Sequence, residues 1–174
     1  MPVEIEIRPV RASEYAAAGE ATALAYQEFA PSRSPGWRAY IARIADVAAR
    51  VERTTVLVVL VDGVIAGSAT LELDQRMNAS VEPLADEEAH LRMLGVHPDF
   101  RGRGVGRALV IACIDLARAR GKRRLTLDTS PVMLAAQQMY AAMGFTATGA
   151  HRTPDGVDLL GYTRDLVSEP STTR

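Results

Sequence analysis

The first third of the chain changes from a strand-like to a helix-like spacing of apolar residues. Residues 3–8 alternate between aliphatic and charged side chains, which predicts a half-buried strand. An alanine-rich stretch follows, and Ser13 has the residue type of an N-cap, so we predict a helix from Ser13 to about Phe29. Proline, serine and glycine at 31–36 break this pattern before a second helix over about 37–51.

Two apolar runs joined by a turn dipeptide predict a hairpin in the middle of the chain. The run 55–61 is β-branched and apolar without alternation, as in a strand covered on both faces. Asp62-Gly63 suits a tight turn, and residues 64–73 supply the returning strand. The polar residues from 75 to 88 predict a long loop, and loops of this length often carry function.

The second half of the chain alternates strands with helices. Its clearest helix follows a glycine-rich turn near Gly104, repeats apolar residues three and four positions apart, and stops at Gly121. The other predicted elements are strands at 91–96, 124–129, 145–148 and 159–166, a helix at 131–143 and a turn at 151–158. Strands interleaved with helices, together with an antiparallel hairpin, predict an α/β fold with a mixed sheet.

Neither a repeat nor an interior linker divides the sequence. Its 174 residues, 48% hydrophobic and 24% charged, have the composition of a globular domain and the length to bury an ordinary apolar core. We predict a single domain over residues 1–167, followed by a loose tail at 168–174.

Charge and cysteine content narrow the classes of function. Twenty basic and 21 acidic residues leave a net charge of −1, which argues against a dedicated nucleic-acid binder. The single Cys113 excludes an internal disulfide and, with scattered histidines, provides no metal-ligand cluster. The sequence contains neither a signal-peptide pattern nor a run near the roughly 18–20 apolar residues of a membrane span. The expected location is the cytoplasm, without a membrane partner.

The most specific signal is the segment VHPDFRGRGVGRAL at 96–109, where a predicted strand runs through a glycine-rich turn into a helix. Amides at a helix N-terminus lack intrahelical partners and lie at the positive end of the helix dipole, so they form an anion site. Glycines let a phosphate approach the main chain, and arginines add bidentate donors. These residues are Gly102, Gly104, Gly106, Arg101, Arg103 and Arg107. We therefore expect a phosphate or diphosphate ligand.

Two nucleotide-binding motifs do not fit this turn. It lacks the Gly-Lys-Ser/Thr ending of a triphosphate loop, and Leu109 stands where a dinucleotide motif requires its last glycine. Arg101, Gly104 and Gly106 instead resemble the Arg/Gln-x-x-Gly-x-Gly/Ala turn of the GNAT superfamily of N-acetyltransferases.

The resemblance extends over roughly residues 3–166. The segment LTLDTS at 125–130, and a later helix that carries Tyr140 and ends in Met-Gly-Phe, are similar to the second half of that family's cofactor site. The resemblance implies a single-domain GNAT fold, with a mixed, mostly antiparallel sheet of about seven strands flanked by about four helices.

The resemblance also implies acetyl-coenzyme A (acetyl-CoA) as co-substrate, with its diphosphate on the glycine turn. We expect no metal cofactor, because the sequence provides no ligand cluster. The strand before the turn would splay from its neighbour and bind the pantetheine arm, and the amide of Leu94 or its neighbour would polarise the thioester carbonyl. The residues expected to bind the cofactor are Met93, Leu94, Val96, Arg101, Gly102, Arg103, Gly104, Val105, Gly106 and Arg107.

Tyr140 is the candidate acid. Taken alone, Tyr140 is typical of a core aromatic residue on an amphipathic helix. The resemblance implies that it is the phenol that protonates the departing coenzyme thiolate. Cys113 lies on the inner stripe of its helix, where a free cysteine usually acts as a small apolar side chain, so we do not expect it to be a nucleophile.

The acceptor amine must lose a proton, and two residues are candidate bases. Many family members carry a glutamate eleven residues before the arginine of the turn, whereas this chain has His90 there. A histidine titrates near pH 6.5 and accepts a proton directly or through water, so His90 is the first candidate and Glu88 the second. The alternative is that His90 is a half-exposed strand residue without a chemical role.

We predict an N-acetyltransferase that moves the acetyl group of acetyl-CoA to a primary amine by direct transfer in a ternary complex. The acceptor would be a small molecule or a protein N-terminus, bound by the loop 75–89 and the two N-terminal helices. Acids near that loop hint at a cationic acceptor, although charge runs are usually only solvated. The resemblance also allows a homodimer.

Two alternatives stay open at this point. The first is a GNAT fold that holds an acyl-CoA as a sensor or scaffold without turnover, which the departure at His90 supports. The second is RNA binding through the basic stretch 101–124, which is weakened because that stretch contains no aromatic residue to stack on bases.

Overall fold

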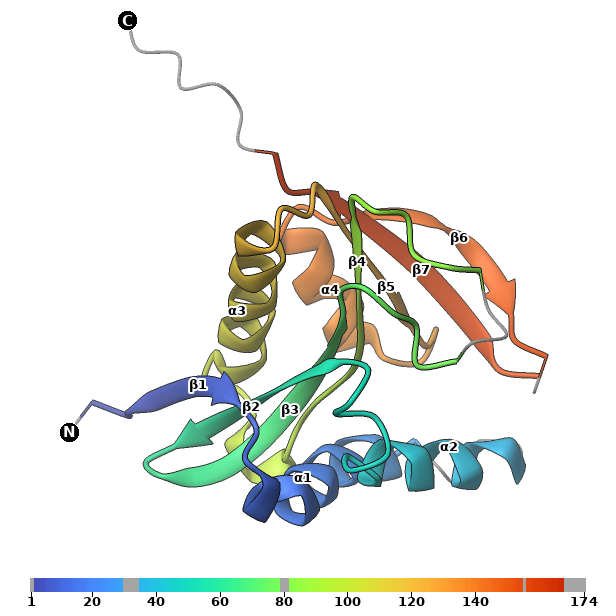
Figure 1. Cartoon of the computed structure of the whole chain (residues 1–174). Coiled ribbons are helices and arrows are strands. Elements are labelled where there is room, and N and C mark those ends of the chain that lie inside the picture. Colours follow the sequence, from blue (N-terminus) through green and yellow to red (C-terminus); the bar gives the residue numbers. More distant parts are fainter. Residues whose placement is uncertain (1, 30–34, 79–81, 155, 168–174) are drawn as a thin grey trace, which may run out of the picture.

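The computed structural model describes residues 2–29, 35–78, 82–154 and 156–167, and Figure 1 shows the strands and helices that they form. The strands are β1 (Ile5–Pro9), β2 (Thr55–Val61), β3 (Val64–Glu72), β4 (Glu88–Val96), β5 (Arg124–Thr129), β6 (Thr146–Arg152) and β7 (Asp158–Asp165). The helices are α1 (Tyr15–Gln27), α2 (Pro35–Ala45), α3 (Val105–Ala119) and α4 (Leu134–Ala142), with 3₁₀ turns η1 (Ala12–Glu14) and η3 (Pro98–Phe100).

The strands form one sheet in the order β1-β2-β3-β4-β5-β7-β6 (Figure 1). Within the described sheet β4 and β5 are parallel, whereas the other neighbouring pairs are antiparallel. A parallel pair needs a crossover connection, and here the chain between β4 and β5 forms α3. The predicted α/β fold with a mixed, mostly antiparallel sheet of about seven strands and about four helices is confirmed.

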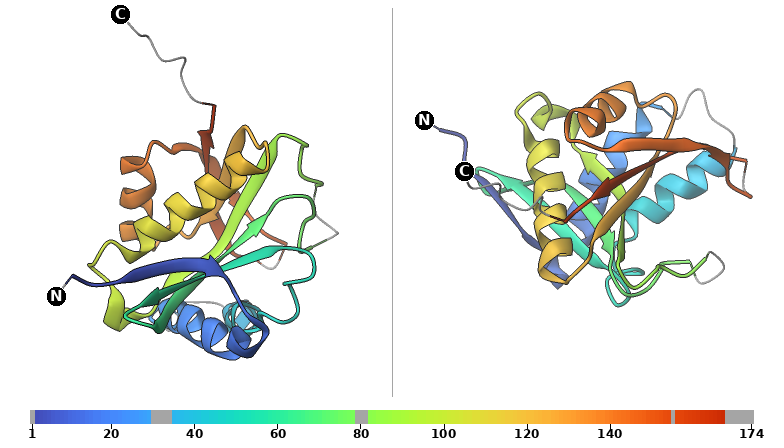
Figure 2. Two further views of the ribbon diagram at one scale, coloured as in Figure 1. Left: turned by 60° about the vertical axis from the view of Figure 1, so that its left-hand side comes forward. Right: turned by 90° about the horizontal axis from the view of Figure 1, so that it is seen from above.

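Helices cover both faces of β2, as its unbroken apolar sequence predicts. Leu57 and Val59 pack in the cluster that contains the buried residues of α3. Val56 and Val58 point the other way and pack with Ala18 of α1. Successive side chains of a strand alternate between faces, so a strand enclosed on both sides has no polar positions. Figure 2 shows α3 and α1 on opposite sides of the sheet.

The hairpin between β2 and β3 turns at the predicted dipeptide. Asp62 and Gly63 have φ angles of 49° and 80°, and the two-residue turn that matches strand twist requires positive φ at both positions. The Asp62 carboxylate also accepts a hydrogen bond of 3.0 Å from the amide of Glu4, which ties the segment before β1 to this turn.

The second helix is shorter than predicted. α2 ends at Ala45, although the apolar pattern continued to about residue 51. The cause is Arg50, whose buried guanidinium donates hydrogen bonds to the carbonyls of Arg43, Ile44 and Asp46 at 2.9, 3.0 and 2.8 Å. The side chain thereby donates hydrogen bonds to carbonyl groups at the end of α2 that would otherwise lack a hydrogen-bond partner.

Several other boundaries differ by a few residues. β4 begins at Glu88 rather than 91 because it pairs there with β5, so the loop before it is shorter than predicted. β6 extends to Arg152, where an ion pair of 2.8 Å with Asp158 accompanies its pairing with β7. Part of the predicted break at 31–36 and the predicted tail at 168–174 lie outside the described residues.

Candidate functional site

β4 and β5 separate partway along their length. Their parallel pairing runs as far as Leu91–Leu127, whereas β4 continues to Val96. Met93, two residues beyond the last pair, has a φ of 53°, which is uncommon for a residue other than glycine. Where the strands diverge there is a cavity of about 520 Å³, within the size range of small-molecule sites.

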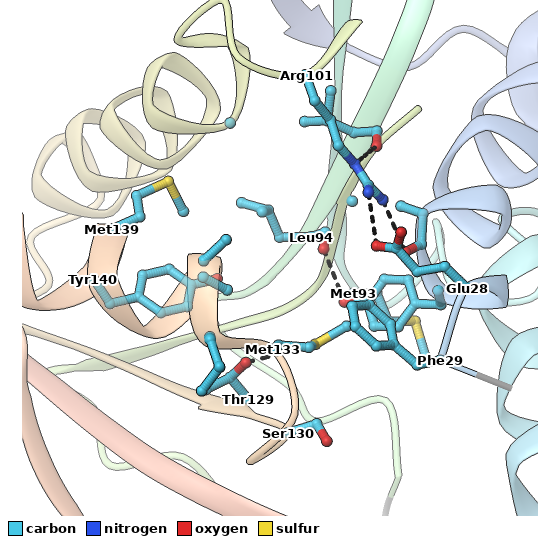
Figure 3. A pocket seen from close by; sticks show the side chains of 18 of the residues that line it. Glu28, Phe29, Met93, Leu94, Arg101, Thr129, Ser130, Met133, Met139 and Tyr140 are labelled. Atoms are coloured by element: carbon cyan, nitrogen blue, oxygen red, sulfur yellow. Dashed lines mark hydrogen bonds and ion pairs between the residues drawn. The ribbon is translucent and has the colours of Figure 1, made fainter. Parts of the chain in front are cut away.

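Four parts of the chain form most of the lining of this cavity (Figure 3). The first is the diverging end of β4, and the second is the glycine turn with the start of α3. The third is the end of β5 and the segment after it, together with Met139 and Tyr140 of α4. The fourth is a group of aromatic side chains from α1, from the residues just after it and from α2: Tyr26, Phe29, Trp37 and Tyr40.

The glycine turn presents open space to the cavity. Gly102 and Gly104 have φ angles of 74° and 73°, a conformation that favours glycine, and Gly104 is the N-cap of α3. A Cβ atom on either residue would meet no other atom within 4 Å. At Gly106 a Cβ would lie in ordinary contact, 3.7 Å from Met139 and Val96. The free amides at the start of α3 therefore border space that an anion can occupy.

Arg101 ties the turn to the end of α1. Its guanidinium donates hydrogen bonds to the Glu28 carboxylate at 2.7 Å, the Ala25 carbonyl at 3.1 Å and the Val96 carbonyl at 3.3 Å (Figure 3). Sequence reasoning expected this side chain to contact phosphate. In the structure its contacts hold the turn against α1 and β4.

The other residues of the turn that were expected to bind the cofactor differ in whether they line the cavity. Val105, Gly106 and Arg107 line the cavity at the first turn of α3. Arg103 lies outside the lining, and its guanidinium carbon is 5.9 Å from the centroid of the Phe100 ring. Arg107 is therefore the better placed of these two arginines to add positive charge to the cavity.

The diverging end of β4 is held by side chains from other elements. The Tyr26 phenol donates a hydrogen bond of 2.8 Å to the Leu94 carbonyl, and Arg101 donates to the Val96 carbonyl. Met93 is buried among the aromatic residues of α1 and α2. A carbonyl oxygen has two lone pairs, so each of these acceptors retains one for a ligand.

Tyr140 projects from α4 into the cavity, as Figure 3 shows. Its buried ring packs against Phe145 and Tyr162, with centroids 5.6 and 6.0 Å away, which fixes the direction of the phenol. Burial raises the pKa of Tyr140, so the phenol is protonated at neutral pH and available as a donor.

The two predicted bases lie outside the cavity lining. His90 is buried beside it, with Nδ1 2.8 Å from the hydroxyl of Thr126 and Nε2 3.7 Å from a carboxylate oxygen of Asp128. Burial, followed by the positive charge of neighbouring arginines, lowers the pKa of His90 to about 3, so the ring is neutral at pH 7. Glu88 lies further away still, at the first residue of β4.

Asp128 is the titratable group that stands between His90 and the cavity. It lines the cavity from β5, with its side chain 31% exposed. Its two carboxylate oxygens lie 3.7 Å from His90 Nε2 and 3.7 Å from His151 Nε2. Burial raises the pKa of Asp128, which strengthens the carboxylate as a proton acceptor.

A comparison with protein families matches residues 20–145 to the acetyltransferase (GNAT) family. The matched range contains the diverging strand, the glycine turn, Asp128 and Tyr140. The chain belongs to the GNAT family. The resemblance carried by Arg101, Gly104 and Gly106 is thereby confirmed.

Curated relatives of this GNAT chain match over a shorter segment. Human N-acetyltransferase 8B is 36% identical over 66 residues, which are 38% of this chain and 29% of that protein. The mycothiol acetyltransferase of Beutenbergia cavernae is 41% identical over 59 residues, 34% of this chain and 20% of that protein. The matched segments thus span less than a third of these relatives.

Solved GNAT structures resemble nearly the whole chain. A putative acetyltransferase from Salmonella typhimurium, solved with its cofactor acetyl-CoA, has a TM-score of 0.66 and 23% identity and covers 97% of this chain and 98% of its own. A GCN5-related N-acetyltransferase from Rhodopseudomonas palustris has a TM-score of 0.73 and 24% identity, covering 95% and 98%. At these identities the likeness establishes the fold.

Other candidate groups of the GNAT chain have ordinary structural contacts. Cys113 is fully buried in α3, and burial raises its pKa to about 12, which disfavours a thiolate nucleophile. In the basic stretch, Arg118 donates to the Leu166 carbonyl and Lys122 to the Asp86 carbonyl, at 3.1 and 2.9 Å. These internal contacts leave fewer cations for an RNA backbone.

Among the described residues no helix has the length and apolarity to cross a bilayer. The same residues contain no group of three or more His, Cys, Asp or Glu side chains placed to hold a metal ion.

Sequence reasoning missed the polar residues that the GNAT fold brings to the cavity from neighbouring strands. Asp128 stands in the segment LTLDTS and Arg92 in the apolar strand β4, and a charged residue inside a buried strand was an available signal. The aromatic residues of α1 and α2 carried no such signal, because aromatic side chains on amphipathic helices usually belong to the core.

Proposed function

We propose that this GNAT domain transfers the acetyl group of acetyl-CoA to a primary amine by direct attack in a ternary complex. One observation carries the proposal: the glycine turn at the start of α3, the diverging end of β4 and the Tyr140 phenol all border the same cavity. An anion site, free main-chain groups and a proton donor are thus available to one bound molecule.

The residues of the glycine turn fit the diphosphate of acetyl-CoA. The space in front of Gly102 and Gly104 is open, and the amides that follow lie at the positive end of the α3 dipole. Arg107 adds a cation. Arg101 would act indirectly, by holding the turn in place through Glu28.

The diverging end of β4 would bind the pantetheine arm and the thioester. Met93, Leu94 and Val96 line the cavity where β5 no longer pairs with β4. The amide of Leu94 or its neighbour would donate to the thioester oxygen, which gains negative charge as the amine attacks. Preorganised donors of this kind lower the barrier because they need not reorient during the reaction.

Asp128 is the residue we propose as proton acceptor. It faces the cavity, whereas His90 is neutral, is hydrogen-bonded to Thr126 and lies behind Asp128. His90 would then act as a positioning residue that orients the Asp128 carboxylate. We assign no part in the reaction to Glu88, because it lies at the far end of β4.

Tyr140 would donate its phenolic proton toward the departing sulfur. The amine nitrogen forms a bond to the acetyl carbon, the carbon–sulfur bond breaks, and the proton released by the amine balances the one taken up by the thiolate. A thiol has a pKa of about 8.5, below that of the buried phenol, so Tyr140 keeps its proton and stabilises the departing thiolate by donating a hydrogen bond, and the thiolate is protonated from solvent as the amine's proton is released.

Two measurements on the purified chain test this function. Calorimetry with acetyl-CoA and with CoA should show saturable binding, and release of free thiol should depend on an added amine, with an acetylated product detected by mass. Binding without turnover on any amine would favour the sensor or scaffold alternative. Absence of binding would contradict both.

A further inference from the structure

The sheet face opposite α3 carries a row of polar side chains beneath the cavity. Leu91 and Leu127 point to the α3 side, where they belong to the main apolar cluster. Because side chains alternate along a strand, Arg92 and Asp128 point to the other face, together with His90. Arg92 and Asp128 both line the cavity.

Arg92 shares its acidic partner Glu72 with a second arginine. Its Nη1 lies 3.3 Å from Glu72, and Arg76 lies 3.2 Å from the same carboxylate, so one acid faces two guanidiniums. Glu72 is fully buried and also accepts the Met77 amide at 2.8 Å. Among the described residues the buried Nε of Arg92 has no hydrogen-bond partner. The side chain as a whole is 27% exposed and lines the cavity, so the outer part of the guanidinium is accessible to an anionic ligand.

Asp128 offers the opposite charge at the same end of the cavity. Burial raises the pKa of Asp128, and the charge of Arg92 opposes that shift; both groups also influence the pKa of Tyr40, so the three lie close enough to interact electrostatically. The carboxylate of Asp128 is 31% exposed and accessible from the cavity.

Aromatic rings from α1 and α2 form the adjoining wall. The ring centroids of Tyr26, Trp37 and Tyr40 lie 5.5 to 6.2 Å apart, in tilted and edge-on arrangements. Phe29 and Met93 extend the same apolar surface along the cavity. Such a wall favours a large apolar or aromatic group.

We infer that the acceptor is an α-amino acid with an aromatic or large apolar side chain, whose carboxylate binds Arg92 and whose amine faces Asp128. This inference rests on the proposed function, of which it specifies the acceptor. The cation, the anion and the apolar wall of the cavity match, in that order, the carboxylate, the amine and the side chain of such a molecule. A protein N-terminus lacks the free carboxylate, so it would offer Arg92 no anionic ligand.

Three related probes separate these possibilities: L-phenylalanine, L-phenylalaninamide and phenethylamine. All have the same ring and a primary amine, but only the first has a carboxylate. We expect kcat/KM for phenylalanine to exceed that of both others by 10-fold or more, in the range of a hydrogen bond to a charged group. Equal or faster acetylation of the amide or of phenethylamine would overturn the inference.

Variants of Arg92 test the same contact from the protein side. Arg92→Gln should reduce the preference for phenylalanine over phenethylamine to less than about 3-fold, and Arg92→Lys should retain part of it because it keeps the charge. Arg38→Gln, on the exposed side of α2, is the matched control and should keep the wild-type preference. A preference that persists in Arg92→Gln would contradict the assignment. The three-probe comparison on the wild-type chain decides the matter if the Arg92 variants do not fold.

The outcome is distinguishable from failure of the proposed function. If no amine were acetylated, the transferase proposal would fail, and the acceptor site would be tested by calorimetry of the three probes with CoA-saturated protein. Tighter binding of phenylalanine than of the amide and phenethylamine would support the site, whereas equal binding or none would overturn it.

Discussion

The Tyr26 phenol donates a hydrogen bond of 2.8 Å to the carbonyl of Leu94, so a side chain of α1 holds the part of β4 that diverges from β5. Burial raises the pKa of Tyr26 well above its usual value, which keeps the phenol protonated as a donor. Through this contact the acceptor side of the cavity is coupled mechanically to the main-chain groups proposed to bind the thioester.

Tyr26→Phe should therefore change both the stability of the fold and its affinity for CoA. Removing the hydroxyl leaves a part-buried carbonyl without its donor, and we expect a loss of about 1–3 kcal/mol in the free energy of unfolding. Urea denaturation and calorimetry with CoA measure the two effects. Unchanged unfolding and unchanged CoA affinity together would contradict a structural role for this hydrogen bond.

Gly104→Asp should abolish CoA binding in a folded protein, because it puts a side chain and a negative charge in the space proposed for the diphosphate. Gly121→Asp is the matched control, since Gly121 has a φ of 75° and also has open space around it, but lies at the other end of α3. Both variants carry a backbone cost of roughly 1–2 kcal/mol. Equal CoA affinity in the two variants would argue against the site.

Tyr140→Phe should lower kcat by roughly 10-fold or more while leaving CoA affinity within a few-fold of the wild type, because the lost interaction is strongest when the thiolate forms. Tyr162→Phe is the control, as its ring packs 6.0 Å from that of Tyr140 without lining the cavity. Steady-state thiol release and calorimetry give the comparison. Wild-type turnover in Tyr140→Phe would remove Tyr140 from the mechanism.

Asp128→Asn should reduce kcat/KM by roughly 10²-fold or more at pH 7, the usual contribution of a general base. Below the raised pKa of Asp128 the wild-type carboxyl is protonated and accepts no proton, so wild-type activity should rise with pH through that pKa. The variant should lack this rise. Asp115→Asn, on the exposed face of α3, should behave as wild type. A variant profile that matched the wild type would exclude Asp128 as the base.

His90 should make the protein sensitive to acid. Its folded-state pKa of about 3 lies below the unfolded value of about 6.5, so the unfolded chain binds the proton first as pH falls. Its stabilising contribution is present above pH 6.5 and is lost between pH 6.5 and 3, which amounts to about 2 kcal/mol between pH 7 and 5. Urea denaturation should show this loss in the wild type and a smaller one in His90→Gln. The same loss in both proteins would contradict the assignment.

Local patterns of the sequence identified most of the fold. The two-sided apolar run of β2, the Asp62-Gly63 turn and the glycine stop of α3 each depend on residue type and spacing alone, and the structure contains all three. The end of α2 could not be predicted in this way, because Arg50 reaches it from outside the helix.

The candidate site also combines features that local sequence predicts with features that depend on tertiary contacts. The glycine turn was visible because left-handed backbone and a helix N-terminus are local properties of a short segment. The surroundings of His90 could not be predicted in this way, since whether its ring faces a cavity or a buried hydroxyl depends on the pairing of β4 with β5.

The sequence by itself determined the kind of protein: a GNAT-like order of strands and helices, with a glycine turn as candidate anion site and a candidate phenol on a later helix. Only the tertiary structure decided which side chains meet in the cavity. Arg92 and Asp128 are 36 positions apart in the sequence and lie on two strands that diverge after Leu91. The aromatic wall comes from two helices near the N-terminus. Contacts between such distant residues follow from strand register and helix packing, which no local pattern encodes.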